Sequence, residues 1–213
     1  MSVRGVDTAS TGGRERDLVE LVDEAGVARG QCSVAEAHRA PGQLHRAFSV
    51  ILRDPDGRLL LQQRAAAKTR FPLRWANACC GHPAPGTPVV AAASRRLAEE
   101  LGVSAVPLRE VGVYAYRATD PATGRVEHEY DHVLVGEVPT DLAVHPDPDE
   151  VAEVDWVPAT ILRDAVQAHP EAYAPWLAGV VAVVAEASTQ RNGDATGFGG
   201  SPEVGRVECV GDG

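Results

Sequence analysis

A loop that leads into a helix, between Gly81 and Val103, constrains the fold of this chain more than any other segment. Residues 81–88 are rich in proline and glycine, which favours a loop. Gly102 then stands where a helix needs a left-handed C-terminal residue. One helix face between these points is formed by Val90, Ser94, Leu97 and Leu101. The segment therefore predicts a long loop followed by one amphipathic helix.

Apolar runs on either side of this segment predict a mixed α and β chain. Residues 46–53 and 57–64 read as strands, and the intervening Asp54-Pro55-Asp56-Gly57 suits a tight turn, so we expect a hairpin. Further strands are expected at 111–118, 126–138 and 150–157, and helices at 159–168 and 172–186. The fold class is α/β (α+β).

The two ends of the chain differ in composition from its centre. Residues 1–16 and 187–213 are rich in Gly, Ser, Thr and Asp, and they hold too little apolar surface to offset the entropy of ordering. We therefore expect a single domain at 17–186 between two disordered tails.

The chain is acidic, and this limits what it binds. Its 213 residues, 44% of them hydrophobic, suffice for a sizeable core. A formal charge of -10 argues against a broad surface for nucleic acid or anionic lipid, so an anionic ligand must meet a local basic pocket. The sequence shows neither a membrane-spanning apolar run nor a signal-peptide core, and we expect a cytoplasmic protein. The cysteines lack a C-x-x-C pattern and indicate reduced thiols: Cys32, Cys79, Cys80 and Cys209.

A thiol and an imidazole stand close together in Cys80-Gly81-His82, at the end of an apolar stretch. Taken alone, the Cys79-Cys80 pair reads more readily as packed core, since free cysteine is among the most buried residue types. The spacing from Gly81 to Val103, however, resembles the Nudix box, a loop, helix and loop that holds divalent metal and diphosphate. Thr87 and Arg96 stand where Nudix hydrolases usually carry Glu, so hydrolysis is disfavoured.

The resemblance extends beyond this box, over roughly residues 17–182. It includes Ala37-His38, Leu44-His45-Arg46-Ala47-Phe48-Ser49, Cys80-Gly81-His82-Pro83, Tyr116-Arg117-Ala118-Thr119-Asp120-Pro121 and Glu127-x-Glu129. Together these motifs look like type I isopentenyl-diphosphate delta-isomerase, of the Nudix superfamily. The resemblance implies a Nudix-type mixed-sheet α/β/α sandwich. It also implies conversion of isopentenyl diphosphate to dimethylallyl diphosphate in isoprenoid biosynthesis.

The resemblance further implies one divalent metal, Mn, Mg or Zn, held by three histidines and two glutamates. Imidazole nitrogens and carboxylate oxygens suit such an ion. Two of the acidic positions lie two apart on an expected strand, so both carboxylates face the same side. The matching positions are His38, His45, His82, Glu127 and Glu129. His128, His132, His145 and His169 match no ligand position.

Moving a double bond requires a proton added at one carbon and another removed two carbons away, through a carbocation or something close to it. By resemblance, Cys80 transfers a proton on one face of the substrate, and Glu129, helped by the Tyr116 hydroxyl, on the other. Trp176 matches a tryptophan whose π-face stabilises the developing cation.

The diphosphate requires local positive charge. By resemblance, Arg64, Lys68 and Arg96 bind phosphate, and Glu100 holds a second metal, Mg, against the diphosphate oxygens. Val34 departs from the pattern, because the family commonly has a phosphate-binding lysine at this position. This change weakens phosphate binding or marks a different substrate.

Three other functions remain open on the sequence. One is a Nudix pyrophosphohydrolase. Another is a related enzyme that protonates, rearranges or cyclises a larger prenyl diphosphate. Val34 is the only residue that suggests this alternative. A third, a metal-stabilised binding module, requires an inert Cys80. We expect a monomer whose partner is a small-molecule prenyl diphosphate, with no nucleic acid and no membrane partner.

Overall fold

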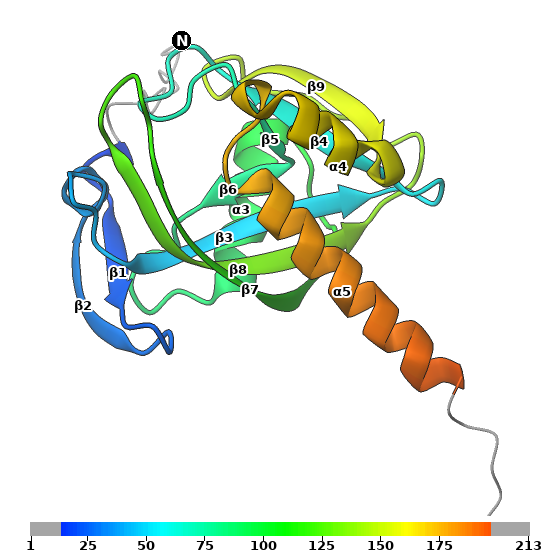
Figure 1. Cartoon of the computed structure of the whole chain (residues 1–213), viewed down its shortest axis with the longest axis horizontal. Coiled ribbons are helices and arrows are strands. Elements are labelled where there is room, and N and C mark those ends of the chain that lie inside the picture. The colour runs from blue at the N-terminus through cyan, green and yellow to red at the C-terminus, as the bar shows by residue number, and fades with distance from the viewer. Residues whose placement is uncertain (1–13, 197–213) are drawn as a thin grey trace, which may run out of the picture.

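The structure, a computed structural model, describes residues 14–196 and centres on a mixed β-sheet (Figure 1). Strand β3 (His45–Arg53) runs parallel to β8 (Val126–Glu137) on one side and antiparallel to the short β6 (Cys79–Gly81) on the other. Strand β7 (Leu108–Thr119) pairs antiparallel with β8. These four strands carry most of the site described below.

A second group of strands forms around β4 (Arg58–Arg64), which pairs antiparallel with β5 (Trp75–Asn77) and β9 (Val151–Pro158). The predicted turn at 54–57 is present, with the Gly57 amide donating to the Asp54 carbonyl at 3.0 Å. The predicted hairpin is correct only at this turn. Past the pair Arg53–Leu59, β3 and β4 separate, because each satisfies its backbone groups with other neighbours.

A small hairpin precedes the predicted strands. Strands β1 (Leu18–Val22) and β2 (Ala28–Ser33) pair antiparallel, and β1 joins the main sheet where Leu21 faces His45. The short helix α2 (Val34–Ala37) follows, with the Ser33 hydroxyl accepting from the Glu36 amide at its start. This hairpin was not predicted, because β2 is mostly exposed and has no run of apolar residues.

Helices cover both faces of the sheet. Helix α3 (Val89–Leu101) lies on one face, and α4 (Ala159–Ala168) and α5 (Leu177–Thr196) lie toward the other (Figure 1). Alternation along β3 supplies both cores, since Phe48 and Val50 pack with α3 residues whereas Ile51 packs with α4 and α5. The predicted layered α/β sandwich is confirmed. Among residues 14–196, no helix combines the length and apolarity needed to cross a membrane.

Helix α3 confirms the helix predicted after the loop, and Gly102 ends it with a φ of 64°. Its buried face differs from the predicted one. Val90 is 39% exposed and Ser94 is exposed, whereas Ala93 and Leu97 are buried. The small alanines let the helix approach the sheet closely, so the face that packs is turned away from Val90.

The last helix begins and ends later than predicted. A 3₁₀ turn η1 (Pro170–Ala172) occupies the start of the predicted helix at 172–186, and α5 runs from Leu177 to Thr196. The helix therefore continues into the segment predicted as a disordered tail, because intrahelical bonding does not require apolar side chains. Likewise Glu15, in the predicted N-terminal tail, makes specific contacts described below. Residues 1–13 and 197–213 of the predicted tails lie outside the described residues.

Candidate metal centre and active-site cavity

Three imidazoles from three separate segments meet beside the start of β3. His38 follows α2, His45 opens β3 and His82 follows β6, with ring centroids 4.7 to 5.1 Å apart. The Nδ1 atoms of His38 and His45 each donate to a backbone carbonyl at 2.8 Å. These bonds fix the tautomer and leave each Nε2 as a lone-pair donor toward the centre of the cluster.

Glu129 completes a four-residue cluster with these histidines. Its Oε1 lies 2.9 Å from Nε2 of His82 and 3.6 Å from Nε2 of His45, and the four ligand atoms all lie within 4.8 Å of one another. Within residues 14–196 the buried Nε2 of His45 has no hydrogen-bond partner. Three nitrogen donors, a carboxylate and an unsatisfied buried lone pair fit a divalent cation.

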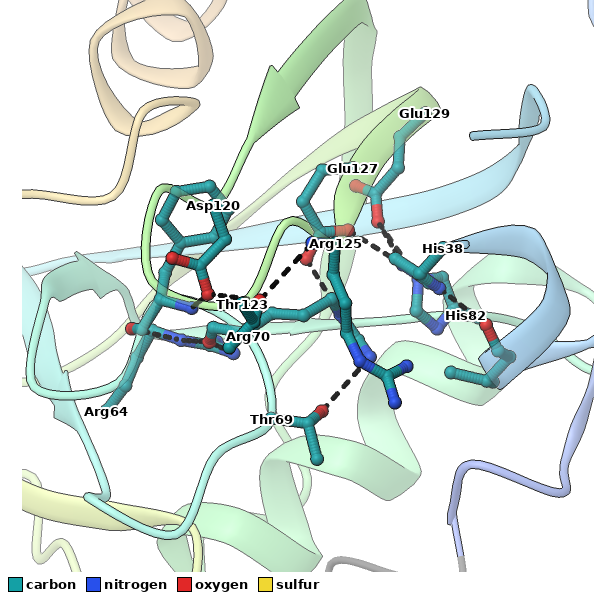
Figure 2. A network of polar contacts seen from close by, with 12 residues as sticks. His38, Arg64, Thr69, Arg70, His82, Asp120, Thr123, Arg125, Glu127 and Glu129 are labelled. Carbon is teal, nitrogen blue, oxygen red and sulfur yellow. Dashed lines mark hydrogen bonds and ion pairs between the residues drawn. The ribbon is translucent and has the colours of Figure 1, made fainter. Parts of the chain in front are cut away.

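Glu127 lies beside this cluster and contacts it through His38. Its Oε2 is 2.8 Å from Nε2 of His38, and its Oε1 accepts from Nε of Arg70 at 2.9 Å. Figure 2 shows His38, Glu127 and Arg70 joined in one line of polar contacts. Burial disfavours its charge, but the Arg70 guanidinium and the His38 imidazole together lower the pKa of Glu127. Glu127 is therefore an ionised carboxylate at the edge of the cluster.

Tyr116 faces Glu129 across the β7–β8 pair and donates its hydroxyl to Oε2 of Glu129 at 2.8 Å. Burial opposes ionisation of Glu129, yet the neighbouring His45 and His82 imidazoles hold its pKa well below the usual value. Burial and the neighbouring Glu129 raise the pKa of Tyr116 well above its usual value. At neutral pH Tyr116 is thus a phenol that donates to a carboxylate.

The adjacent cysteines point to opposite faces of β6. Cys79 is fully buried in the core under α3, whereas Cys80 lines a cavity on the other face. The Cys80 thiol donates to Oδ1 of Asn77 at 3.2 Å and lies 3.7 Å from the Ser49 hydroxyl. Burial raises the pKa of Cys80 to about 12. A packing role therefore describes Cys79, and Cys80 is a protonated thiol at a cavity wall.

One cavity of about 1060 Å³ is lined by predicted site residues from strands β4, β6, β7 and β8, from helix α3 and from three loops. His38 and His45 lie fully buried behind its wall. The predicted residues that line it are Cys80, His82, Glu127, Glu129, Tyr116, Arg64, Lys68, Arg96 and Trp176.

Trp176 forms an aromatic wall of this cavity and is held in place by Asn77. Its Nε1 donates to Oδ1 of Asn77 at 3.0 Å, the same oxygen that accepts from the Cys80 thiol. The rings of Phe71 and Tyr116 lie 5.6 and 6.0 Å from the Trp176 ring. Asn77 therefore fixes the thiol and the indole relative to each other.

The basic residues of the cavity are held in two ways. Arg64 donates to the carbonyls of Arg70 at 2.9 Å and Phe71 at 3.1 Å, and its guanidinium lies 5.5 Å from the Trp176 ring centre. Lys68 instead pairs with Glu150, and Nη2 of Arg96 lies 3.7 Å from the same carboxylate. The cavity lining thus includes several cationic side chains although the chain is acidic.

A family model described as NUDIX domain matches residues 43–178. The chain is 66% identical over 165 residues to a protein of Nocardia farcinica (strain IFM 10152) named isopentenyl-diphosphate Delta-isomerase, which covers 78% of this chain and 93% of that one. It belongs to the Nudix superfamily, as a type I isopentenyl-diphosphate isomerase. A protein of the same name from Streptomyces coelicolor (strain ATCC BAA-471 / A3(2) / M145) is 45% identical over 90% of this chain and 95% of its own length.

Two solved structures share the fold of this isomerase family member. DR0079 from Deinococcus radiodurans aligns with a TM-score of 0.62 at 23% identity, over 78% of this chain and 97% of its own. A MutT protein from Methanosarcina mazei Go1 aligns with a TM-score of 0.51 at 13% identity, over 70% of this chain and 95% of its own. At these identities the likeness extends to the fold alone.

Glu100 is the one predicted site residue that neither lines the cavity nor touches the histidine cluster. It sits on the inward face of α3, 2% exposed, and accepts from Gln62 Nε2 at 3.0 Å and from the Arg96 guanidinium. Its predicted role as ligand of a second metal in this Nudix isomerase stays a prediction.

Several residues of the site were not singled out from the sequence. Asn77 stands three residues before Cys80, and an amide side chain this close to a candidate proton-transfer residue was a usable signal. The others depend on contacts between distant segments, which no local pattern reveals. They are Ser49, whose hydroxyl donates to Asp131 at 2.7 Å, Arg70 on Glu127, Glu15 on Arg70, and Glu150 between the basic side chains.

Proposed function

We propose that this chain isomerises isopentenyl diphosphate to dimethylallyl diphosphate. One observation carries the proposal: a single cavity brings together the Cys80 thiol, the Glu129 carboxylate with its Tyr116 donor, and the Trp176 ring. These are the parts that an alkene isomerisation needs, namely two proton-transfer groups and a surface for a developing cation. Relatives named isopentenyl-diphosphate Delta-isomerase at 66% and 45% identity support the same substrate.

The proton count of the site balances for this reaction. The raised pKa of Cys80 and the lowered pKa of Glu129 mean that the pair holds one proton between its two groups. One group gives a proton to an alkene carbon, and the other takes a proton from the carbon two positions away. The reverse reaction exchanges the two roles. Each turnover therefore leaves the number of protons on the pair unchanged.

The positive charge that develops between these steps falls on the tertiary carbon. We assign its stabilisation to the Trp176 ring, an interaction worth about 0.5 to 2 kcal/mol at a site away from water. The ring is suited to this role because Asn77 holds its Nε1 and the Phe71 ring packs against it.

The residues that would hold a divalent ion are His38, His45, His82 and Glu129, with Glu127 beside them. A bound ion would supply positive charge next to Glu129 and would tie separate segments together. We propose Mn, Mg or Zn for this site. We also propose that Arg64, Lys68 and Arg96 bind the diphosphate, together with a Mg held by Glu100.

The proposal is tested by incubating the protein with isopentenyl diphosphate and Mg while measuring dimethylallyl diphosphate and free phosphate. Dimethylallyl diphosphate without phosphate is the expected result. Release of inorganic phosphate or isopentenyl monophosphate would instead identify a hydrolase. An unchanged substrate would favour an enzyme for a larger prenyl diphosphate.

A further inference from the structure

The segment before β1 lies along the turn that begins α2. The Val34 amide donates to the Asp17 carbonyl at 2.8 Å, and the Ala35 amide donates to the Glu15 carbonyl at 3.0 Å. These bonds fix residues 15–17 against Val34, whose side chain is apolar and 5% exposed. A positive charge on this side of the cavity must therefore come from a residue other than Val34.

Glu15 anchors this segment on the far side of the cavity mouth. Its carboxylate accepts from the Thr69 hydroxyl, from Nη1 of Arg70 and from Nη1 of Arg125, each at 2.8 Å. Partial burial disfavours the charge, but Arg70, Thr69 and Arg125 together lower the pKa of Glu15. Three donors on one ionised carboxylate hold the backbone of the neighbouring residue in place.

That neighbouring residue is Arg14, which lines the same cavity as Lys68 and Arg96. Its Nη2 lies 2.7 Å from Oε1 of Glu150, and its Nη1 lies 3.5 Å from Oε2 of Glu99. Lys68 pairs with the other oxygen of Glu150, which is 3% exposed. The buried Glu150 carboxylate therefore forms ion pairs with cations from two distant parts of the chain.

Arg14 also has donor capacity to spare. Within the part of the chain that the structure describes, its Nε is buried and has no hydrogen-bond partner. Its side chain is 30% exposed and lines the cavity. A guanidinium fork placed beside an ammonium group and a second guanidinium matches the geometry by which proteins bind phosphate oxygens.

We propose that Arg14 binds the diphosphate of the substrate, as a cation that the segment before β1 supplies next to the apolar Val34. The inference rests on the proposed function for the identity of the substrate. Glu15 and Glu150 are positioning residues in this arrangement, since Glu15 holds the segment and Glu150 orients the guanidinium.

The test compares Arg14→Met and Arg14→Lys with the wild-type chain in two measurements. One is steady-state kinetics with isopentenyl diphosphate, and the other is calorimetric binding of inorganic diphosphate in the presence of Mg. Loss of a charge-assisted bond should raise KM and the Kd for diphosphate about tenfold or more in Arg14→Met, with kcat within about twofold. Arg14→Lys keeps the charge, so its KM and its Kd for diphosphate should lie between those of the wild type and those of Arg14→Met.

Arg109→Met is the matched control, because Arg109 is exposed on β7 and does not line the cavity. It should leave both measurements unchanged. An Arg14→Met chain with wild-type KM and wild-type diphosphate affinity would overturn the inference, as would a loss confined to kcat. If the wild-type chain fails to isomerise isopentenyl diphosphate, the proposed function fails, while diphosphate binding still decides the role of Arg14.

Discussion

At the scale of single residues, Cys79 and Cys80 differ in their surroundings although they are neighbours and chemically identical. Strand alternation sends the Cys79 side chain into the core under α3 and the Cys80 side chain into the cavity. Burial raises the pKa of both thiols, so neither is a thiolate in the resting protein. Of the two, only Cys80 lines the cavity.

Replacing Cys80 by Ala should abolish turnover of isopentenyl diphosphate, because one member of the proton-transfer pair is then missing. We expect a loss of about 10² to 10⁴-fold or more in kcat, the range for a general acid or base. Cys79→Ala is the control, and its kcat should stay within a few-fold of wild type. Equal losses in the two variants would show that packing, not proton transfer, explains the effect.

At the scale of elements, Asp120 at the end of β7 fixes the loop between β4 and β5. Its carboxylate accepts from the Phe71 amide at 3.1 Å, from the Ala122 amide at 3.0 Å and from the Thr123 hydroxyl at 2.8 Å. The loop it holds carries Phe71, which packs against Trp176. A turn between two strands thus supports the aromatic wall of the cavity.

Asp120→Asn should lower the free energy of unfolding by about 1 to 3 kcal/mol at neutral pH, because the charged acceptor of several donors is lost. Burial works against ionisation, but the Ala122 and Thr123 donors outweigh it and lower the pKa of Asp120 below its usual 3.8. Its contribution is therefore complete above pH 3.8 and is lost as the pH falls through the lowered value. Urea unfolding at pH 7 and at successively lower pH measures this loss of stability.

The difference in free energy of unfolding between Asp120→Asn and wild type should be largest at pH 7 and should decrease in acid. Asp141→Asn, at an exposed position, should match wild type throughout. A difference that stays constant down to the lowest pH at which the protein folds would show that the charge of Asp120 does not stabilise the loop.

The elements that could be predicted are those with a clear local pattern. β3, β4, α3 and α4 have apolar runs or helical spacing, and each was found within a few residues of its predicted position. The pairing of β3 with β8 and of β4 with β9 could not be predicted, because backbone bonding between distant strands leaves no local trace. The start of α5 was misplaced for a similar reason, since η1 forms where Tyr173 bridges to Trp75.

At the scale of the whole molecule, the histidine cluster connects segments that are distant in sequence. His38, His45, His82 and Glu129 come from the end of α2, from β3, from the loop after β6 and from β8. The spacing of these residues could be matched to a family pattern, so their sequence positions were predictable. Their convergence depends on the β3–β8 register, which places His45 opposite Glu129.

A divalent ion at this cluster should therefore stabilise the entire fold. Thermal unfolding should shift to lower temperature with a chelator and to higher temperature with excess Mn²⁺ or Zn²⁺, by about 2.7 kcal/mol at a hundredfold excess over Kd. His45→Gln should lose most of this response, and His128→Gln, outside the cluster, should keep it. Identical responses in both variants would exclude the cluster as the metal site.

The central claim is that a proton from the protein enters the alkene while another leaves the substrate. The most direct measurement is NMR of isopentenyl diphosphate incubated with the wild-type protein and Mg in deuterated water. The product should be dimethylallyl diphosphate with deuterium in the methyl group formed from the terminal alkene carbon, and no phosphate should be released. Dimethylallyl diphosphate without deuterium, or hydrolysis of the diphosphate, would contradict the account.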